Sequence, residues 1–382
     1  MTSLLETEDE TMLRDAARGF LADAAPVANL RANRDQGRPF DTGLWREMAQ
    51  MGWAGVLVPE AQGGADMGHR AAGILAEEMG RTLAASPFIS SAVMAATTLR
   101  AAASQQAEQA LTAITEGRLI YAVALDEGRK HAPLNTALVA QRAGNGFRLT
   151  GTKAFVADGG SAQRVLVLAR TAGSAGEAAG LTLFDSPADR AGLHKMARAT
   201  VDSRDHAQMV FDGVEATGDE VLGTLDDGWA LLSRGVQAGQ AAVAAELLGV
   251  AGGAYGMTVG YLKERKQFDR TIGSFQALQH RAAHLWAEIE VTASAIANAG
   301  RVLDVTPAEA GLAVSLAKAR AAQTVDLAVR EGVQMHGGIG MTDAYDIGFY
   351  MKRARVGTEW LGDYGYHAAQ VAAARGFGGR GG

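Results

Sequence analysis

The order of the hydrophobic periodicities along the chain is the feature that most constrains its fold. Apolar residues recur at helical spacing over about residues 6–116 and again from about 227 to 374. Between them, over about residues 119–221, short alternating runs separated by Gly, Asn and Asp predict strands. Strands that alternate with helices build a parallel sheet, whereas this chain groups its strands in one block. The order therefore predicts a helical, a β and a second helical unit.

Local patterns support this division. Leu13, Ala17, Phe20 and Leu21 fall on one face of a first helix. In the β block, Gly144-Asn145-Gly146 separates the runs ALVAQRA and FRLTGTKAF, which indicates a β-hairpin. We expect an α+β multidomain protein with an all-α N-terminal domain, a central β-barrel and a C-terminal four-helix bundle. The expected bounds are 1–117, 118–225 and 226–376, followed by a flexible tail at 377–382.

Composition excludes several classes of protein. The formal net charge of -6 over 382 residues, without a Lys/Arg-rich run, argues against a nucleic acid partner. The chain has no cysteine, so disulfides and thiolate metal sites are excluded. The N-terminus lacks the basic and apolar regions of a secretory signal, and no uninterrupted apolar run reaches membrane-spanning length. We therefore expect a cytoplasmic protein that does not enter a membrane.

A metal site is conceivable at one helix face only. His280 and His284 lie four residues apart, and Glu288 follows one turn later. A site there needs a further ligand from elsewhere, and nothing in the sequence supplies a candidate. We favour ordinary surface or core histidines and predict no metal.

Two stretches point to a more specific ligand. ERKQFDRTIGSFQALQHR, residues 264–281, crosses a turn between two helices, and QMHGG, residues 334–338, places two glycines after a helix-like run. Together Arg265, Gln276 and Gln334 supply one fixed cation and two amides, and the glycine turn supplies exposed backbone N–H groups. A pyrophosphate and an adenosine edge require such a set.

These stretches, together with VPEAQGG in the first unit and GTKAFVADG in the second, resemble the acyl-CoA dehydrogenase family over nearly the whole chain. The resemblance implies FAD at a subunit interface, where the C-terminal domain of one chain holds the ADP half of its neighbour's cofactor. The residues it assigns to this task are Arg265, Gln267, Phe268, Phe275, Gln276, Gln334, Met335, His336, Gly337 and Gly338. It further implies α,β-dehydrogenation of an acyl-CoA in fatty acid or steroid side-chain degradation, with electron-transfer flavoprotein as the acceptor.

The family's catalytic glutamate is absent from both of its usual positions. In many members it lies near the C-terminus, where this chain has Leu361 in EWLGD. A second branch carries it early in the C-terminal domain, where this chain has Gly239, followed by Gln240 in place of an arginine expected near CoA. Glu246 and Glu359 are the nearest acids in sequence. We favour structural roles for both and keep Glu246 as a weak candidate for the base.

The flavin-ring side also departs from the family pattern. Residues 126–131, DEGRKH, stand where members usually show Thr-Glu-Pro followed by Gly-Ser-Asp. Phe155-Val156-Ala157 replaces a Trp-Ile-Thr triplet, and Ala157 removes a hydroxyl expected near the flavin. Arg129 and Lys130 could meet a CoA phosphate, although solvated loop charges are the commoner explanation.

Some bacterial acyl-CoA dehydrogenases are heteromers in which one chain carries the base and the other completes the FAD site. Through AAELLGVA and WLGD, this sequence resembles the second kind. We therefore predict a subunit of an FAD-dependent acyl-CoA dehydrogenase that assembles with a chain of the same family. Two alternatives stay open: a self-sufficient homomeric flavin enzyme with a relocated base such as Glu246, and a non-catalytic, flavin-poor assembly subunit.

Overall fold

The computed structural model describes residues 5–377, so most of the expected tail, residues 378–382, lies outside the described residues. The chain folds into two compact units built from interleaved segments. One unit contains residues 5–37, 69–85 and 240–377, and the other contains residues 38–68 and 86–239. The division into three domains at the bounds expected from the sequence remains a prediction.

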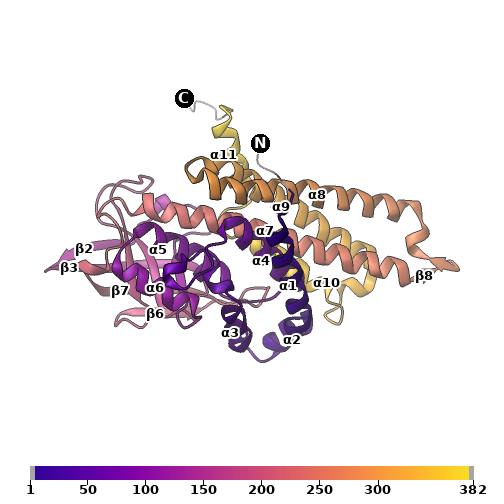
Figure 1. Ribbon diagram of the computed structural model, residues 1–382, viewed down its shortest axis with the longest axis horizontal. Coiled ribbons are helices and arrows are strands. Elements are labelled where there is room, and N and C mark those ends of the chain that lie inside the picture. The colour runs from indigo at the N-terminus through magenta and orange to yellow at the C-terminus, as the bar shows by residue number, and fades with distance from the viewer. Residues whose placement is uncertain (1–4, 378–382) are drawn as a thin grey trace. The chain divides into compact units, whose positions relative to one another are not determined.

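The first unit is helical (Figure 1). Its helices are α1 (Glu8–Ala24), α2 (Val27–Asp35), α4 (Gly68–Thr82), most of α7 (Gly228–Glu264), α8 (Gln276–Val305), α9 (Ala310–His336), α10 (Ile347–Glu359) and α11 (Tyr364–Ala374). The expected first helix is confirmed as α1, in which Ala17 and Leu21 are buried. It begins with a capping box, because Thr7 accepts from the backbone N–H of Glu10 while the Glu10 carboxylate accepts from that of Thr7.

Helix α7 is apolar around most of its circumference, which is typical of a helix buried on all sides. It is long and apolar enough to cross a membrane by length and composition alone. Most of its most apolar window is nevertheless buried inside the protein, and Val243, Leu247 and Ala251 have no exposed surface. A core helix of a soluble protein passes the same test, so α7 is weak evidence for a membrane.

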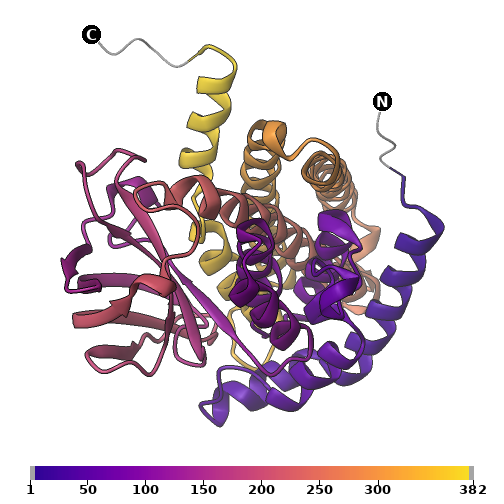
Figure 2. The same ribbon diagram turned by 60° about the vertical axis from the view of Figure 1, so that its left-hand side comes forward.

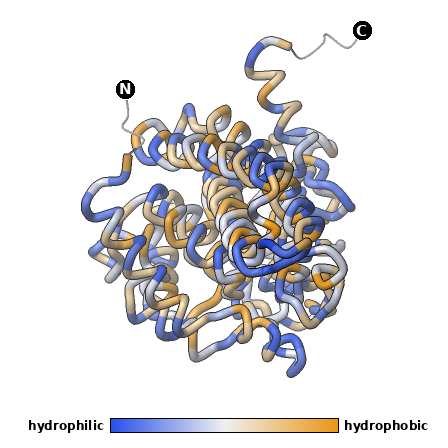
Figure 3. The backbone as a smooth tube through the Cα atoms, turned by 90° about the vertical axis from the view of Figure 1, so that its right-hand side faces the viewer, coloured by the Kyte–Doolittle hydropathy of each residue, from blue (hydrophilic) through white to orange (hydrophobic). Residues whose placement is uncertain are grey.

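Two glycines let α4 and α7 cross at backbone contact. A Cβ atom on Gly249 would lie 1.8 Å from the carbonyl oxygen of Glu77, and one on Gly80 would lie 2.1 Å from that of Glu246. Both distances are far below van der Waals contact, so any side chain here would push the two helices apart. Elsewhere hydrophilic and hydrophobic residues alternate along the helices, as amphipathic helices require (Figure 3).

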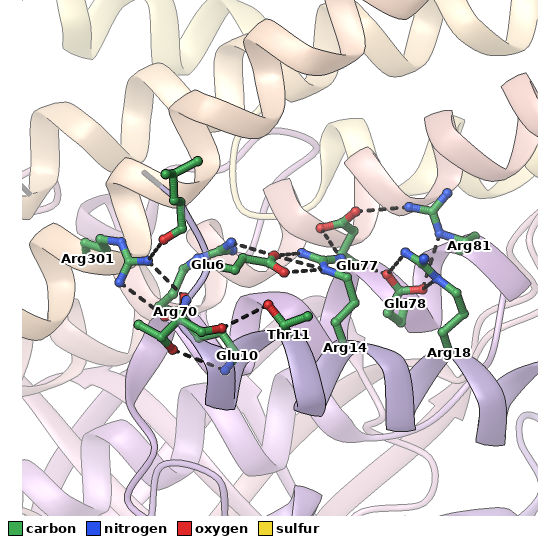
Figure 4. A network of polar contacts seen from close by, with 12 residues as sticks. Glu6, Glu10, Thr11, Arg14, Arg18, Arg70, Glu77, Glu78, Arg81 and Arg301 are labelled. Carbon is green, nitrogen blue, oxygen red and sulfur yellow. Dashed lines mark hydrogen bonds and ion pairs between the residues drawn. The ribbon is translucent and has the colours of Figure 1, made fainter. Parts of the chain in front are cut away.

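A network of charged side chains ties α1 to α4 (Figure 4). The Glu78 carboxylate, 1% exposed, accepts hydrogen bonds from Arg14 at 2.7 Å, from Arg18 at 2.9 Å and from Arg81 at 3.3 Å. Burial alone would raise the pKa of Glu78, but the hydrogen bonds and charges of these arginines outweigh it and lower that pKa. Farther along, Arg301 of α8 pairs with Glu10 at 2.9 Å.

The second unit is built around one seven-stranded sheet (Figure 2). Its strands are β1 (Tyr121–Ala124), β2 (Val139–Ala143), β3 (Gly146–Ala157), β4 (Arg164–Arg170), β5 (Leu181–Pro187), β6 (Leu193–Ala197) and β7 (His206–Thr217). They follow the order β1-β4-β2-β3-β7-β6, with β5 paired to β4. The expected hairpin is confirmed, since Ala143 pairs with Gly146 and leaves a two-residue loop. The helical segments of this unit are α3 (Thr42–Gln50), η3 (Phe88–Ala95), α5 (Ala96–Ala102) and α6 (Gln105–Thr115).

Candidate functional site

The stretch after α7 forms a small hairpin at the surface of the first unit. Strands β8 (Lys266–Gln267) and β9 (Arg270–Thr271) pair antiparallel, and the two residues between them, Phe268 and Asp269, have φ angles of 53° and 61°. Such angles are those of a tight turn with two left-handed residues. Arg265 and Gln267 are exposed, and the Phe268 side chain is 86% exposed. The hairpin thus presents a cation, an amide and an aromatic ring to the surroundings.

A second aromatic ring lies beside the hairpin. Phe275 meets Phe268 edge to face, with ring centroids 6.2 Å apart, and the Arg270 guanidinium carbon lies 4.0 Å from the Phe275 centroid. Gln276, the first residue of α8, is exposed. Stacked cations and exposed rings suit the phosphate and the base of a nucleotide.

The glycine turn follows directly on α9. Gly337 has φ 65° and ψ -144°, a conformation that a residue with a side chain rarely adopts. A Cβ atom on Gly337 or Gly338 would meet nothing within 4 Å, so the backbone faces open space. Gln334 is exposed, whereas Met335 and His336 are buried, at 5% and 3% exposure. The Gly337 N–H donates to the Gln334 carbonyl, so a ligand would meet the open backbone around Gly338, while the two buried side chains act through packing.

The structure connects the two stretches. The ring of Tyr261, in the last turn of α7, packs on the ring of His336 with centroids 4.5 Å apart. The Tyr261 carbonyl also accepts the backbone N–H of Arg265 at 2.9 Å. Tyr261 thus contacts both Arg265, through its backbone, and the residue before the glycine turn, through its ring. These residues fit the ADP half of FAD, which needs a fixed cation and unobstructed amides.

One position of the missing glutamate, Leu361, lies in a turn of the first unit that is bound by Gln240, the residue that follows the other position. The Gln240 side-chain amide donates to the Leu361 carbonyl at 3.1 Å, and His367 Nε2 lies 3.1 Å from the same oxygen. Leu361 is 3% exposed and has a φ of 59°, which is rare for a residue with a side chain. An aliphatic side chain therefore fills one position, and an amide bound to that turn lies next to the other.

The Lys318 side chain also binds the turn that contains Leu361. Its ammonium is fully buried and donates to the carbonyls of Gly357, Thr358 and Gly362 at 3.1, 3.2 and 2.9 Å. Burial lowers the pKa of Lys318 to about 7, although three nearby carboxylates oppose the shift. Lys318 lies outside the motifs that predicted functional residues. A lone lysine among alanines on an apolar helix face, as in SLAKARAA, is the signal that could have found it.

Glu246 is committed to an ion pair. It is 4% exposed, and its carboxylate lies 3.1 Å from a guanidinium nitrogen of Arg353, which has no exposed surface. Arg353 also donates to the Leu83 carbonyl at 3.1 Å. Glu359 pairs at 2.9 Å with Arg355 one turn away on α10. These contacts support the structural roles favoured for both acids.

In the second unit, a buried lysine organises the loop after β1. Lys153 is fully buried and contacts the Leu125 carbonyl and the Glu127 carboxylate, both at 2.8 Å. Burial lowers the pKa of Lys153 to about 8, against the opposing charge of Glu127. In the same loop His131 Nδ1 lies 2.8 Å from the Asp126 carboxylate. The residues that replace the family's Thr-Glu-Pro thus hold their own loop in place.

Other positions on the expected flavin-ring side differ in their exposure. Phe155 is 59% exposed with a φ of 48°, at an irregularity in the pairing of β3 with β7. Ala157, at the end of β3, is 9% exposed. Arg129 and Lys130 are exposed, which is compatible with either of their expected roles.

Among the described residues, the face of α8 that carries His280 and His284 does not form a metal site. His284 lies 3.7 Å from Glu288, which pairs with Arg320 at 2.6 Å. Over residues 5–377, no group of three or more His, Asp or Glu side chains could hold a metal ion.

Comparison with known proteins decides the family. Residues 7–118 match the family description "Acyl-CoA dehydrogenase, N-terminal domain", and residues 226–375 match "Acyl-CoA dehydrogenase, C-terminal domain". Acyl-CoA dehydrogenase IpdE2 of Mycobacterium tuberculosis is 31% identical over 356 residues, which cover 93% of each chain. The chain belongs to the acyl-CoA dehydrogenase family. Membership confirms the predicted fold, the oxidoreductase class acting on CH–CH bonds and FAD as the family's cofactor.

Two solved structures of this family are heteromers by name. A Tcur3481-Tcur3483 steroid ACAD variant matches with a TM-score of 0.86 and 32% identity, over 97% of this chain and 98% of that one. The ChsE4-ChsE5 complex of Mycobacterium tuberculosis matches with a TM-score of 0.89 and 25% identity, over 98% and 99%. The chain is similar to proteins that assemble from two different subunits.

Proposed function

We propose that this chain is one subunit of a heteromeric, FAD-dependent acyl-CoA dehydrogenase and that it completes the FAD site of a partner chain from the same family. One observation carries the proposal. The turn that holds a glutamate in many members here holds Leu361, whose carbonyl is bound by Gln240 and His367. A buried side chain without a proton acceptor cannot serve as the base.

Each subunit then has a distinct part in the reaction. FAD, when bound, supplies the acceptor for the hydride that leaves the β-carbon of the acyl-CoA. The α-proton needs a carboxylate within hydrogen-bond reach, which the partner chain supplies. In this chain, Arg265 and the open backbone of the glycine turn at Gly338 bind and orient the ADP half. The exposed ring of Phe268 meets the half-buried ring of Phe275, over which the Arg270 guanidinium lies.

The heteromeric relatives support this assignment of roles, since both named complexes pair two chains. We infer a cytoplasmic enzyme that passes its electrons to an electron-transfer flavoprotein. We propose an acyl-CoA thioester as the substrate and do not specify its acyl group. Glu246 as a relocated base is less well supported, because Arg353 neutralises it in a buried pair.

Loss of the Arg265 guanidinium is expected to release flavin. Arg265→Ala removes the permanent cation at the start of the exposed hairpin while leaving the hairpin otherwise intact. A charge-assisted hydrogen bond contributes about 1.5–3 kcal/mol, so FAD affinity should fall by about one to two orders of magnitude. Flavin absorbance per assembled protein, measured by titration at limiting FAD, checks this.

Lys263→Ala is the matched control, because it removes a nearby exposed cation on the last turn of α7. It should leave the FAD affinity close to that of the unchanged protein. An Arg265→Ala protein that keeps its full flavin content would contradict the assignment of the ADP site.

Assembly and flavin binding are expected to depend on each other. If the ADP half is held by one chain and the ring by another, a monomer cannot bind FAD tightly. We expect a dimer or tetramer in which the exposed face of α8 between Phe275 and Ile289 contributes to packing. Trp286, 53% exposed, lies on that face beside a groove of about 390 Å³ between α7 and α8. Light scattering coupled to flavin absorbance tests this, and a monomer with stoichiometric FAD would refute it.

A further inference from the structure

Tyr261 connects the two parts of the proposed ADP site through both its backbone and its ring. Its carbonyl accepts the Arg265 N–H at 2.9 Å, which closes the last turn of α7 before the hairpin. Its ring lies on His336 with centroids 4.5 Å apart and an interplanar angle of 33°. The ring contact is not visible in the sequence, since 75 positions separate Tyr261 from His336.

Three rings form a cluster under the glycine turn. Tyr345 lies 4.8 Å from His336 and 6.0 Å from Tyr261, measured between ring centroids. His336 Nδ1 lies 2.6 Å from the Gly332 carbonyl, which can only accept, so Nδ1 carries the proton. Among residues 5–377, its buried Nε2 has no hydrogen-bond partner. The imidazole is therefore neutral and is held mainly by ring contacts.

This cluster determines where the glycine amides point. Gly337 and Gly338 have no side chains to anchor them, and a Cβ atom at either position would touch nothing within 4 Å. The Gly337 N–H donates to the Gln334 carbonyl, so the start of the turn is fixed to the end of α9, where the His336 ring packs against both Tyr261 and Tyr345. Displacement of the imidazole would move the amides relative to the Arg265 hairpin.

We propose that Tyr261 is a positioning residue for FAD: its ring, through His336, places the Gly337-Gly338 turn relative to the Arg265 cation. The inference rests on the proposed function, because it assumes that these groups hold the ADP half of the cofactor. It adds a residue that does not itself touch the cofactor. Tyr345 also contacts the imidazole, and the three rings form a triangle with centroid distances of 4.5, 4.8 and 6.0 Å.

The test compares Tyr261→Leu with Tyr261→Phe in the assembled protein, with FAD dissociation constants measured by flavin fluorescence. An aromatic pair contributes enough that losing the ring should weaken FAD binding about tenfold. Tyr261→Phe keeps the ring and should bind FAD like the unchanged protein. Equal weakening by both variants, or by neither, would overturn the inference. Tyr364→Leu removes an exposed tyrosine at the start of α11 and serves as the matched control.

Arg265→Ala, measured in parallel, separates this inference from the proposed function. If Arg265→Ala loses FAD and Tyr261→Leu does not, only the positioning role fails. If both variants bind FAD normally, the proposed ADP site itself is wrong. If Tyr261→Leu does not assemble, the acid response of His336 decides instead.

Burial lowers the pKa of His336 below its usual 6.5, against the hydrogen bond to the Gly332 carbonyl. His336 therefore binds a proton more readily when the turn is unfolded than when it is folded. The folded turn loses stability as the pH falls below 6.5. The other titratable groups that face the cluster are Tyr261, Tyr345, Glu264 and Asp346, and burial raises the pKa of Tyr345 above its usual value.

FAD should therefore be released progressively below pH 6.5 from the unchanged protein. His336→Phe, which retains a ring but cannot be protonated, should release less FAD under the same conditions. An identical acid profile for this variant and the unchanged protein would contradict the role of the cluster. An acid profile that flattens in His336→Phe would support it.

Discussion

Purified without a partner, this chain should reduce a dye with straight-chain acyl-CoA only poorly. A positioned general base contributes about 10²–10⁴-fold to proton abstraction, and neither Leu361 nor Gly239 can accept a proton. Co-expression with a family member that retains its glutamate should restore turnover by a comparable factor. Acyl-CoA-dependent dye reduction, measured per bound flavin, gives the comparison.

The partner's glutamate provides the decisive control. Its replacement by glutamine in the co-expressed assembly should remove turnover while leaving flavin content unchanged. Robust activity of this chain alone, lost on Glu246→Gln with the fold intact, would instead establish a homomeric enzyme with a relocated base. A chain that binds little flavin and does not raise a partner's activity would be an assembly subunit.

Glu246→Gln should destabilise the protein strongly. Arg353 has no exposed surface and pairs with Glu246 at 3.1 Å, so the change removes a carboxylate that pairs with a buried guanidinium. Breaking such a buried pair on one side costs about 3–5 kcal/mol. Chemical denaturation of the assembled protein, or its thermal midpoint where unfolding is irreversible, measures the loss.

Glu359→Gln is the matched control, because Glu359 pairs with Arg355 at 2.9 Å on the outer face of α10. A helix-surface pair of this kind contributes only about 0.3–0.5 kcal/mol. Equal stabilities for the two variants would mean that the Glu246 pair is not a structural element. Restoration of stability by combining Glu246→Gln with Arg353→Met would show that the unpaired charge caused the loss.

Part of the candidate site could be predicted because its signals are local. Gly337 adopts a positive φ in open space, and the sequence shows this as two glycines after a helical run. The two-residue hairpin loop before Gly146 is equally local. Arg265 could be placed beside a turn from its own neighbours. Its alignment with the glycine amides could not, because Tyr261 and His336 come from different helices.

The meaning of the missing glutamate also needed the structure. The resemblance to the family places Leu361 and Gly239 at two separate positions of the family pattern. Only packing shows that Gln240, 121 residues before Leu361, donates to the Leu361 carbonyl. Similarly, in the sequence alone Glu246 is an acid on an apolar helix. Only the structure shows that it pairs with Arg353, 107 residues later.

The sequence by itself determined the order of helical, β and helical segments, the turns between them and the residue types offered to a nucleotide. Those properties follow from hydrophobic periodicity and from backbone preferences of glycine, which act over a few neighbouring residues. The tertiary structure alone decided which charges are neutralised, as with Glu246 and Arg353, and which carbonyls Lys318 binds. These outcomes depend on how distant helices pack, because a buried charge is stable only where folding brings a partner to it.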